Sequence, residues 1–347
     1  MKRREFLRGA IASGAVAGGL SVSFGDENGN VISNVPTGPV FVGKKADTFT
    51  KNWGDPQAEH CTSYVSECEN KMLWIRRDNQ MLATYRNGQH QKYPYVYPLA
   101  GPKSMISVTT ESAQPWPHHR SMFFGLDRVN GGNYWQGSAE RGQIFSKNEL
   151  KIEEASESKV IWTDACLWKQ PEQDPDMEDF RRYTIDWRCD DYYVVDFYVK
   201  WTPLRDVTIE HTNHGFFGVR VTNDLSVDGG GFLVNSNGQT RQKGENGTEG
   251  KVARWCACYG KRYFNPAITE GVAVLCPPNI TPAEPTFENC TWFTRDYGNI
   301  SPMPFNYNPG PWLFKKGETR EVTYRTVVFA GTPADVDLDG LWNEIYK

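Results

Sequence analysis

Residues 181–201 read RRYTIDWRCDDYYVVDFYVKW. In the first half Tyr183, Ile185 and Trp187 alternate with polar side chains, and a similar alternation resumes after the polar turn CDD at 189–191. Successive side chains of a β-strand point to opposite faces, so a period of two indicates strands with one buried face each. The stretch therefore predicts an antiparallel hairpin of two long strands.

The same period of two continues on both sides of this hairpin. Clusters of Gly, Asn and Pro separate the runs, and strands do not alternate with helices, which argues against a parallel α/β sheet. We therefore predict an all-β fold, a large antiparallel β-sandwich of the supersandwich type. The further predicted strands are SKVIWTDACLWK (158–169), RDVTIEH (205–211), GFFGVRVTN (215–223), EGVAVLC (270–276) and TREVTYRTVVFAG (319–331).

A short helix is predicted at the end of the chain, where residues 332–347 read TPADVDLDGLWNEIYK. Thr332 is a suitable N-cap, and Pro333 suits the first helical position because its missing N–H has no partner there. No linker-like break interrupts residues 45–347, so we predict a single β-sandwich domain over that range. The residues expected on one helical face are Leu338, Leu341, Trp342 and Ile345.

Residues 1–24 are typical of a twin-arginine export signal. Arg3 and Arg4 precede Phe6-Leu7 and a Gly/Ala-rich run over 9–20, which is too short and too weakly apolar for a membrane span. We expect residues 25–44 to be a linker and the protein to be exported, to the periplasm or the cell surface. Export permits disulfides among the eight cysteines, whose pairing the sequence does not predict.

The composition of the chain limits the kinds of molecule that it is expected to bind. A net charge of −4 argues against a nucleic-acid partner, because such proteins carry basic surfaces. We expect no integral membrane span, since no later segment is apolar over 18 residues. An aromatic content of 13% indicates many strands and a surface able to stack on sugar rings.

The first candidate site is WPHHR at 116–120. Imidazoles transfer protons near neutral pH, and an arginine beside them can bind a carboxylate or stabilise negative charge. Pro115 and Pro117 predict an extended loop, in which His118 and His119 could converge. The alternative is a polar turn that the imidazoles hold together by hydrogen bonds.

The second candidate, TIEHTNHGFFGVRVTND at 208–224, contains His211 and His214 three residues apart, together with Arg220 and Asp224. That spacing suits a divalent metal if the backbone turns there, and otherwise indicates a polar hairpin. The third, TWFTRDYGNISPMPF at 291–305, places Arg295, Asp296 and Tyr297 together, either as a structural corner or as a pocket wall. No nucleophile elbow, zinc-protease motif or phosphate-binding loop is present.

Seven segments, taken together and in this order, resemble the soluble bacterial PmoA-like family over roughly residues 70–331. The resemblance implies export and a β-sandwich of carbohydrate-active type, and the family's label, methane oxygenase PmoA, implies copper. The family pattern has Asp-His before His-His-Arg, where Pro115 and Trp116 stand here, so Trp116 could instead stack on a sugar. The segments are YPYVYPLAGP (93–102), HHRSMFFGLDRVNGGNYW (118–135), HGFFGVRVTNDL (214–225), GKVARW (250–255), GVAVLC (271–276), TRDYGNISPMPF (294–305) and GETREVTYRTVVFAG (317–331).

The resemblance favours one shared pocket and an exported carbohydrate-active enzyme. We expect it to cleave a glycan or modified sugar by hydrolysis or elimination, or to epimerise it, with histidine as acid or base and Asp224 or Asp296 as carboxylate partner. The alternatives are a non-catalytic carbohydrate-binding protein and a metal-dependent oxidoreductase that uses the four histidines of both clusters. The predicted catalytic residues are His118, His119, Arg120 and His214; the predicted substrate-binding residues are Trp116, Trp135, Arg220, Arg254, Trp255, Arg295, Asp296 and Tyr297. The sequence predicts neither the identity of a bound metal nor the oligomeric state.

Overall fold

The computed structural model of the chain describes residues 40–44, 72–77, 80–137, 139–279, 290–305 and 310–347. The predicted export signal at 1–24 and the predicted linker as far as residue 39 lie outside these residues. The last five residues of that linker form strand β1 (Val40–Lys44), which pairs with β2.

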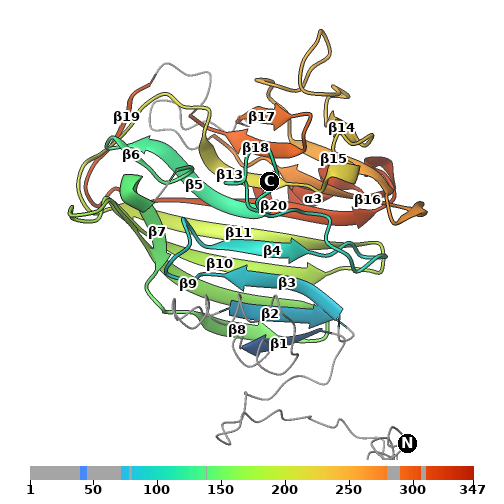
Figure 1. Cartoon of the computed structure of the whole chain (residues 1–347), viewed down its shortest axis with the longest axis horizontal. Helices are drawn as coiled ribbons and strands as arrows, with labels where there is room; N and C mark the ends of the chain where they lie inside the picture. Colours follow the sequence, from blue (N-terminus) through green and yellow to red (C-terminus); the bar gives the residue numbers. More distant parts are fainter. Residues whose placement is uncertain (1–39, 45–71, 78–79, 138, 280–289, 306–309) are drawn as a thin grey trace, which may run out of the picture.

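Two antiparallel sheets form the described part of the chain, and their strands overlap in the view of Figure 1. The predicted all-β antiparallel sandwich is therefore confirmed. In order across the first sheet lie β1, β2 (Met72–Arg77), β3 (Gln80–Arg86), β4 (Tyr95–Leu99), β5 (Met122–Val129), β13 (Gly215–Arg220), β18 (Asn299–Met303) and β17 (Thr291–Arg295), with β6 (Gly132–Asn133), β12 (Val207–Ile209) and β19 (Trp312–Phe314) at one side. Across the second lie β14 (Phe232–Asn235), β15 (Trp255–Arg262), β16 (Asn265–Leu275), β20 (Arg320–Ala330), β11 (Tyr192–Pro203), β10 (Met177–Trp187), β9 (Lys159–Lys169) and β7 (Gln143–Ser146), with β8 (Lys151–Ala155) beside β9.

The predicted hairpin is strands β10 and β11, which pair along their whole length with Trp187 opposite Tyr193. Every second residue of β10 is buried, from Met177 to Trp187, as a period of two requires. The buried face meets the first sheet through aromatic rings: Phe197 of β11 lies 5.3 Å from Phe124 of β5, between ring centroids. Burying one such side chain contributes about 1.5–3 kcal/mol, so these rings hold the two layers together.

A charged pair lies inside this core. Arg181 and Asp179 both belong to the inward face of β10, and neither side chain is exposed to solvent. The guanidinium donates from Nε and Nη2 to the two carboxylate oxygens at 2.7 and 2.8 Å, and the Trp168 indole donates to the same carboxylate at 2.6 Å. Such a pair is stable only while both partners are present, because either charge alone would be buried without compensation.

The C-terminal helix begins later than predicted. Thr332 caps a 3₁₀ turn over Pro333–Asp335, and the α-helix α3 (Leu338–Tyr346) begins after Asp337, whose carboxylate accepts a hydrogen bond from the Gly340 N–H at 2.8 Å. Helix α3 packs on the outer face of the second sheet, with Leu338, Leu341 and Trp342 buried.

Arg254 and Trp255 both bind a carboxylate of helix α3. They had been predicted to bind the ligand, and this contact corrects that prediction. The Arg254 guanidinium makes two hydrogen bonds of 2.9 Å to the Asp339 carboxylate, and the Trp255 indole donates to the same group at 2.9 Å. Both residues belong to the β15 side of the second sheet, so they fix α3 and do not join the histidines.

Two further observations concern the predicted disulfides and the predicted lack of a membrane span. Within the described ranges, the six cysteines are free. In the same ranges we find no helix that is long and apolar enough to cross a membrane.

Candidate functional site

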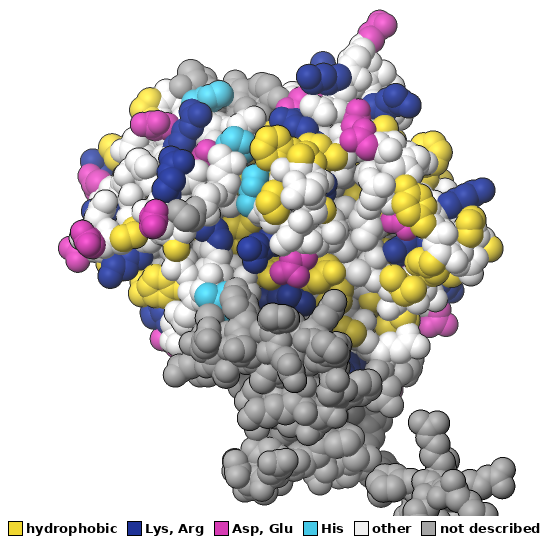
Figure 2. Space-filling model, viewed as in Figure 1, with side chains coloured by type: hydrophobic (Ala, Val, Ile, Leu, Met, Phe, Trp, Pro, Cys, Tyr) yellow, Lys and Arg dark blue, Asp and Glu magenta, His cyan; other side chains and the backbone are white. Residues whose placement is uncertain are grey.

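The candidate site lies on the face of the first sheet that points away from the core. Phe124 of β5 and Phe217 of β13 point inward, where both contact Phe197. Because side chains alternate, Phe123 of β5 and Arg220 of β13 point to the other face. In Figure 2 cyan histidine side chains gather in the upper middle of the molecule, beside apolar side chains and above basic ones.

His118 and His119 come from the loop between β4 and β5, as the flanking prolines predicted. The Tyr93 hydroxyl donates to the His118 carbonyl, and the His119 N–H donates to the Trp116 carbonyl at 3.0 Å. The two imidazole rings stand edge to face with centroids 4.4 Å apart. Trp116, with 46% of its surface exposed, lies 6.0 Å from the His118 ring.

His214 is oriented by a carboxylate that sequence reasoning missed. Its Nδ1 lies 3.0 Å from Oδ2 of Asp127, which is almost fully buried and also accepts a hydrogen bond from the Thr212 hydroxyl. In the tautomer that donates from Nδ1 to this carboxylate, Nε2 carries the lone pair. This carboxylate–imidazole pair is the arrangement by which enzymes orient a general base.

Gly215 allows His214 to approach Asp127. Its φ is +141°, and a Cβ atom there would lie 2.4 Å from a methyl carbon of Leu126 on the neighbouring strand. Gly215 pairs with Leu126, and the Asp127 N–H donates to the His214 carbonyl at 3.1 Å. A residue without a side chain is required at this close approach of β13 to β5.

The histidines of the two distant segments share one electrostatic environment. Burial, together with smaller contributions from His214, Arg220 and Arg120, lowers the pKa of His118 to about 4. His118 is therefore neutral near pH 7 and able to accept a proton. His214, Arg120 and Arg220 are thus near enough to His118 to influence its charge, and the prediction that these residues line one pocket stays a prediction.

His119 lies beneath the site and not at its surface, which corrects its prediction as a catalytic residue. Only 2% of it is exposed, and its ring packs 5.8 Å from Phe123 and 5.8 Å from Trp135, between centroids. Burial, with smaller contributions from neighbouring groups that include Arg220, lowers the pKa of His119 to about 2.

This buried imidazole makes stability depend on pH. Below about pH 6.5 the unfolded chain binds a proton at His119 that the folded protein does not bind, so stability falls as the pH falls towards 2. We expect His119→Phe to remove about 2 kcal/mol of the stability loss between pH 7 and pH 5, measured by urea unfolding. Trp116→Ala, in the same loop, should keep the wild-type loss; an unchanged pH dependence in His119→Phe would refute the assignment.

Arg295 and Tyr297 border the site, and Asp296 serves a different purpose. Arg295 forms an ion pair with Glu249 at 2.8 Å, not with Asp296, and lies over the Phe293 ring, 3.7 Å from its centroid. Burial raises the pKa of Tyr297 to about 12, so its hydroxyl stays protonated at neutral pH. Asp296 accepts a hydrogen bond from the Gln242 N–H at 2.7 Å and is thereby a structural corner.

Three other predicted residues do not face a ligand. Trp135 is wholly buried beside Phe123, so it cannot stack on a sugar. Asp224 is buried in an ion pair with Arg262 at 2.8 Å. His211 is exposed, and its carbonyl accepts a hydrogen bond from Arg128 at 2.6 Å.

The prediction of a metal ligand pair at His211 and His214 gains no support from the arrangement of side chains. Within the residues that the structure describes, no group of three or more His, Cys, Asp or Glu side chains is placed to hold a metal ion. The imidazole of His214 is instead hydrogen-bonded to the carboxylate of Asp127.

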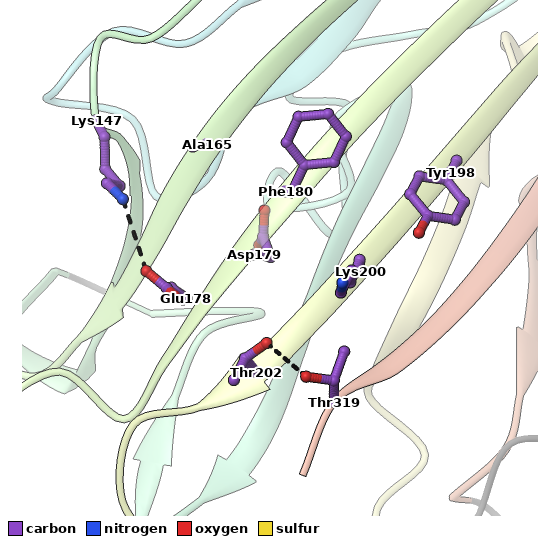
Figure 3. Close-up of a pocket in the computed structure, with 9 residues that line it drawn as sticks. All are labelled: Lys147, Ala165, Glu178, Asp179, Phe180, Tyr198, Lys200, Thr202 and Thr319. Carbon is purple, nitrogen blue, oxygen red and sulfur yellow. Dashed lines mark hydrogen bonds and ion pairs between the residues drawn. The ribbon is translucent and has the colours of Figure 1, made fainter. Parts of the chain in front are cut away.

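A depression lies elsewhere, on the outward face of β10 and β11 (Figure 3). Phe180 and Tyr198 stand there with ring centroids 6.5 Å apart, and Lys147 forms an ion pair with Glu178 at 3.6 Å. No imidazole is among the residues that line this depression. Among the described histidines, His118, His119 and His214 lie with the first sheet instead.

The fold and the site together define a β-sandwich protein with a histidine- and arginine-lined site on the outer face of one sheet. The chain belongs to the family described as "Family of unknown function (DUF6807)", whose model matches residues 73–343. No curated protein matches the chain. The resemblance to PmoA-like proteins stays a prediction.

Solved structures similar to this chain include sugar epimerases at very low identity. A protein of Klebsiella pneumoniae, provisionally assigned as an aldose 1-epimerase, is 8% identical, with 80% of this chain and 84% of that chain covered and a TM-score of 0.40. The galactose 1-epimerase of Lactobacillus acidophilus is 9% identical, with 76% and 96% covered and a TM-score of 0.32. These scores are too low to carry a conclusion about activity.

Proposed function

We propose that this protein is an enzyme that transfers protons on a sugar bound at the outer face of the first sheet, by epimerisation or elimination. The observation that supports this most directly is the hydrogen bond between His214 and the buried Asp127, beside the neutral imidazole of His118. An imidazole held by a carboxylate, with a second imidazole nearby, suits the removal and return of a proton.

Each group has a role in this proposal. His214 accepts the proton at Nε2, and Asp127 stabilises the imidazolium that forms. The His214 imidazolium then gives the proton to the departing oxygen in elimination, or to the opposite face of the carbon in epimerisation. His118, which is neutral, is a second proton acceptor beside the ligand. Arg120 stabilises negative charge that develops on the ligand; it donates to Gln91 at 2.8 Å and lies about 4.0 Å from Glu111.

A sugar is the proposed ligand because of the rim of the site. Trp116 presents an exposed apolar ring beside His118, and pyranose rings stack on such faces. Hydrolysis in its usual form needs two carboxylates flanking the bond. The two predicted carboxylate partners, Asp224 and Asp296, are committed to other contacts, so we favour proton transfer at carbon over hydrolysis.

The experiment is a screen of the purified protein against neutral and acidic monosaccharides and oligosaccharides, with products separated by chromatography. We expect an epimer or an unsaturated sugar from at least one ligand. Release of a shorter saturated sugar would instead indicate hydrolysis. Binding without conversion would overturn the proposal in favour of a carbohydrate-binding protein.

We also propose that the protein is exported through the twin-arginine route, on the basis of Arg3 and Arg4 in the N-terminal sequence. Replacing both by lysine should retain the protein in the cytoplasm, because this route requires the arginine pair, and cell fractionation with immunoblotting measures the distribution. The matched control replaces Lys2 and Arg8 by the opposite basic residue. Unchanged export of the Arg3→Lys/Arg4→Lys variant would contradict the proposal.

A further inference from the structure

Arg220 is a buried cation at the base of the candidate site. It is the last residue of β13, pairs across the sheet with Asn299 of β18, and is only 3% exposed. Its guanidinium carbon lies 4.2 Å from the centroid of the Tyr297 ring. Its positive charge is among the causes that lower the pKa of His118 and of His119, so it lies close to both imidazoles.

Arg220 forms no ion pair with the described residues, and the carboxylate of Asp228 acts on its charge only from a distance. Nη2 donates to the Gln114 carbonyl at 3.2 Å, while Nε and Nη1 are buried without a hydrogen-bond partner in the described part of the chain. Burial lowers the pKa of Arg220 accordingly. A buried charge without compensation destabilises a fold by several kcal/mol, so its presence indicates a function that needs it.

Other buried arginines of this fold, unlike Arg220, form ion pairs with carboxylates. Arg181 is paired with Asp179 at 2.7 Å, Arg262 with Asp224 at 2.8 Å and with Glu270 at 2.7 Å. The fold therefore neutralises arginines that serve only its stability, and Arg220 stands apart from them.

Two more polar atoms around Arg220 are buried and lack a partner within the described ranges. They are Nδ1 of His119 and Oδ1 of Asn299. Each fork of a guanidinium that a carboxylate matches combines Nη2 with either Nε or Nη1, so a carboxylate at Nη2 would also engage one of the two free atoms of Arg220. An amide oxygen accepts a hydrogen bond from a hydroxyl. Donors for an anion and an acceptor for a hydroxyl are thus combined in one place, which is the chemistry of a sugar acid.

We infer that Arg220 binds the carboxylate of an acidic sugar, a uronic acid or a uronate residue of a glycan. The identity of the ligand as a sugar rests on the proposed function; the need for an anion rests on Arg220 itself. The free guanidinium atoms are closed to solvent, and the turn at 112–117 lies over them through the Gln114 carbonyl. The carboxylate takes the place of this carbonyl, and the exposed turn shifts to admit it.

The test is isothermal titration calorimetry with the methyl glycosides of glucuronate and galacturonate, and with those of glucose and galactose. We expect the wild type to bind at least one uronate about 10- to 100-fold more tightly than its neutral counterpart, the range for a hydrogen bond to a charged group. Arg220→Met should lose this preference without a fall in melting temperature, because it removes an uncompensated buried charge.

Two controls make the result specific. Arg254→Gln removes an arginine on the other sheet, which binds Asp339, and should keep the preference. The methyl ester of the uronate removes the charge from the ligand and leaves the protein unchanged, so it tests the inference even if Arg220→Met does not fold. Equal affinity of the wild type for the acid, its ester and the neutral sugar would overturn the inference.

The outcomes separate this inference from the proposed function. Preferential binding of uronate without any conversion would support the carboxylate site and refute the enzyme. Conversion of neutral sugars together with no preference for uronates would support the enzyme and refute the carboxylate site.

Discussion

His214→Ala lowers the turnover of the sugar substrate by about 10²–10⁴-fold, the range for removal of a proton-transfer group. The reason is that Nε2 of His214 accepts the proton while Asp127 holds its Nδ1 at 3.0 Å. The melting temperature should change little, because the ring is partly exposed and packs against few apolar groups. Steady-state kinetics and thermal unfolding of the same preparations measure both effects.

His211→Ala is the matched control, since this exposed histidine lies three residues away and only its backbone carbonyl makes a described contact. It should keep wild-type turnover. Asp127→Asn keeps the shape of the side chain but removes the charge that stabilises the imidazolium, so kcat should fall. Equal turnover in His214→Ala and wild type would refute the role of the pair.

Arg181→Ala destabilises the fold by about 3–5 kcal/mol, because it leaves the carboxylate of Asp179 buried without its charged partner. Both side chains are closed to solvent between the two sheets, and the guanidinium also lies 5.5 Å from the Phe124 ring centroid. The free energy of unfolding in urea measures the loss. A variant that does not fold at 25 °C meets the same expectation.

The adjacent arginine supplies the control. Arg182 points to the opposite face of β10 and pairs with Glu153 at 2.8 Å on the surface. Arg182→Ala should cost less than about 1 kcal/mol, since exposed ion pairs contribute little. Replacing both core partners, with Asp179→Leu and Arg181→Met, should recover much of the lost stability. Similar losses in Arg181→Ala and Arg182→Ala would contradict the burial of the pair.

The strands could be predicted because their signal is local. Tyr183, Ile185 and Trp187 share a face in any strand, whichever strand lies beside them. The same period extends to Arg181, which lies on that inward face, but the sequence did not show that Asp179, two residues earlier, would neutralise it. The start of α3 was missed because Thr332 and Asp335 close a separate 3₁₀ turn first.

The site could be predicted only in parts. His118 and His214 were recognisable as reactive residues, but their convergence depends on the pairing of β5 with β13, which joins segments about ninety residues apart. Asp127 was missed for the same reason, since one aspartate in a strand looks like any outward polar residue. Arg254 and Trp255 were misplaced because a shared pattern of residues does not say which sheet carries them.

Solvent deuterium incorporation into a bound sugar tests the central claim, proton transfer by His214 and His118, most directly. The protein is incubated with its sugar ligand in D₂O, and loss of a carbon-bound proton is followed by proton NMR. The account predicts exchange at one carbon by the wild type and by His211→Ala, and exchange slower by about 10²-fold or more in His214→Ala. No exchange by the wild type, with a ligand bound and unchanged, would contradict it.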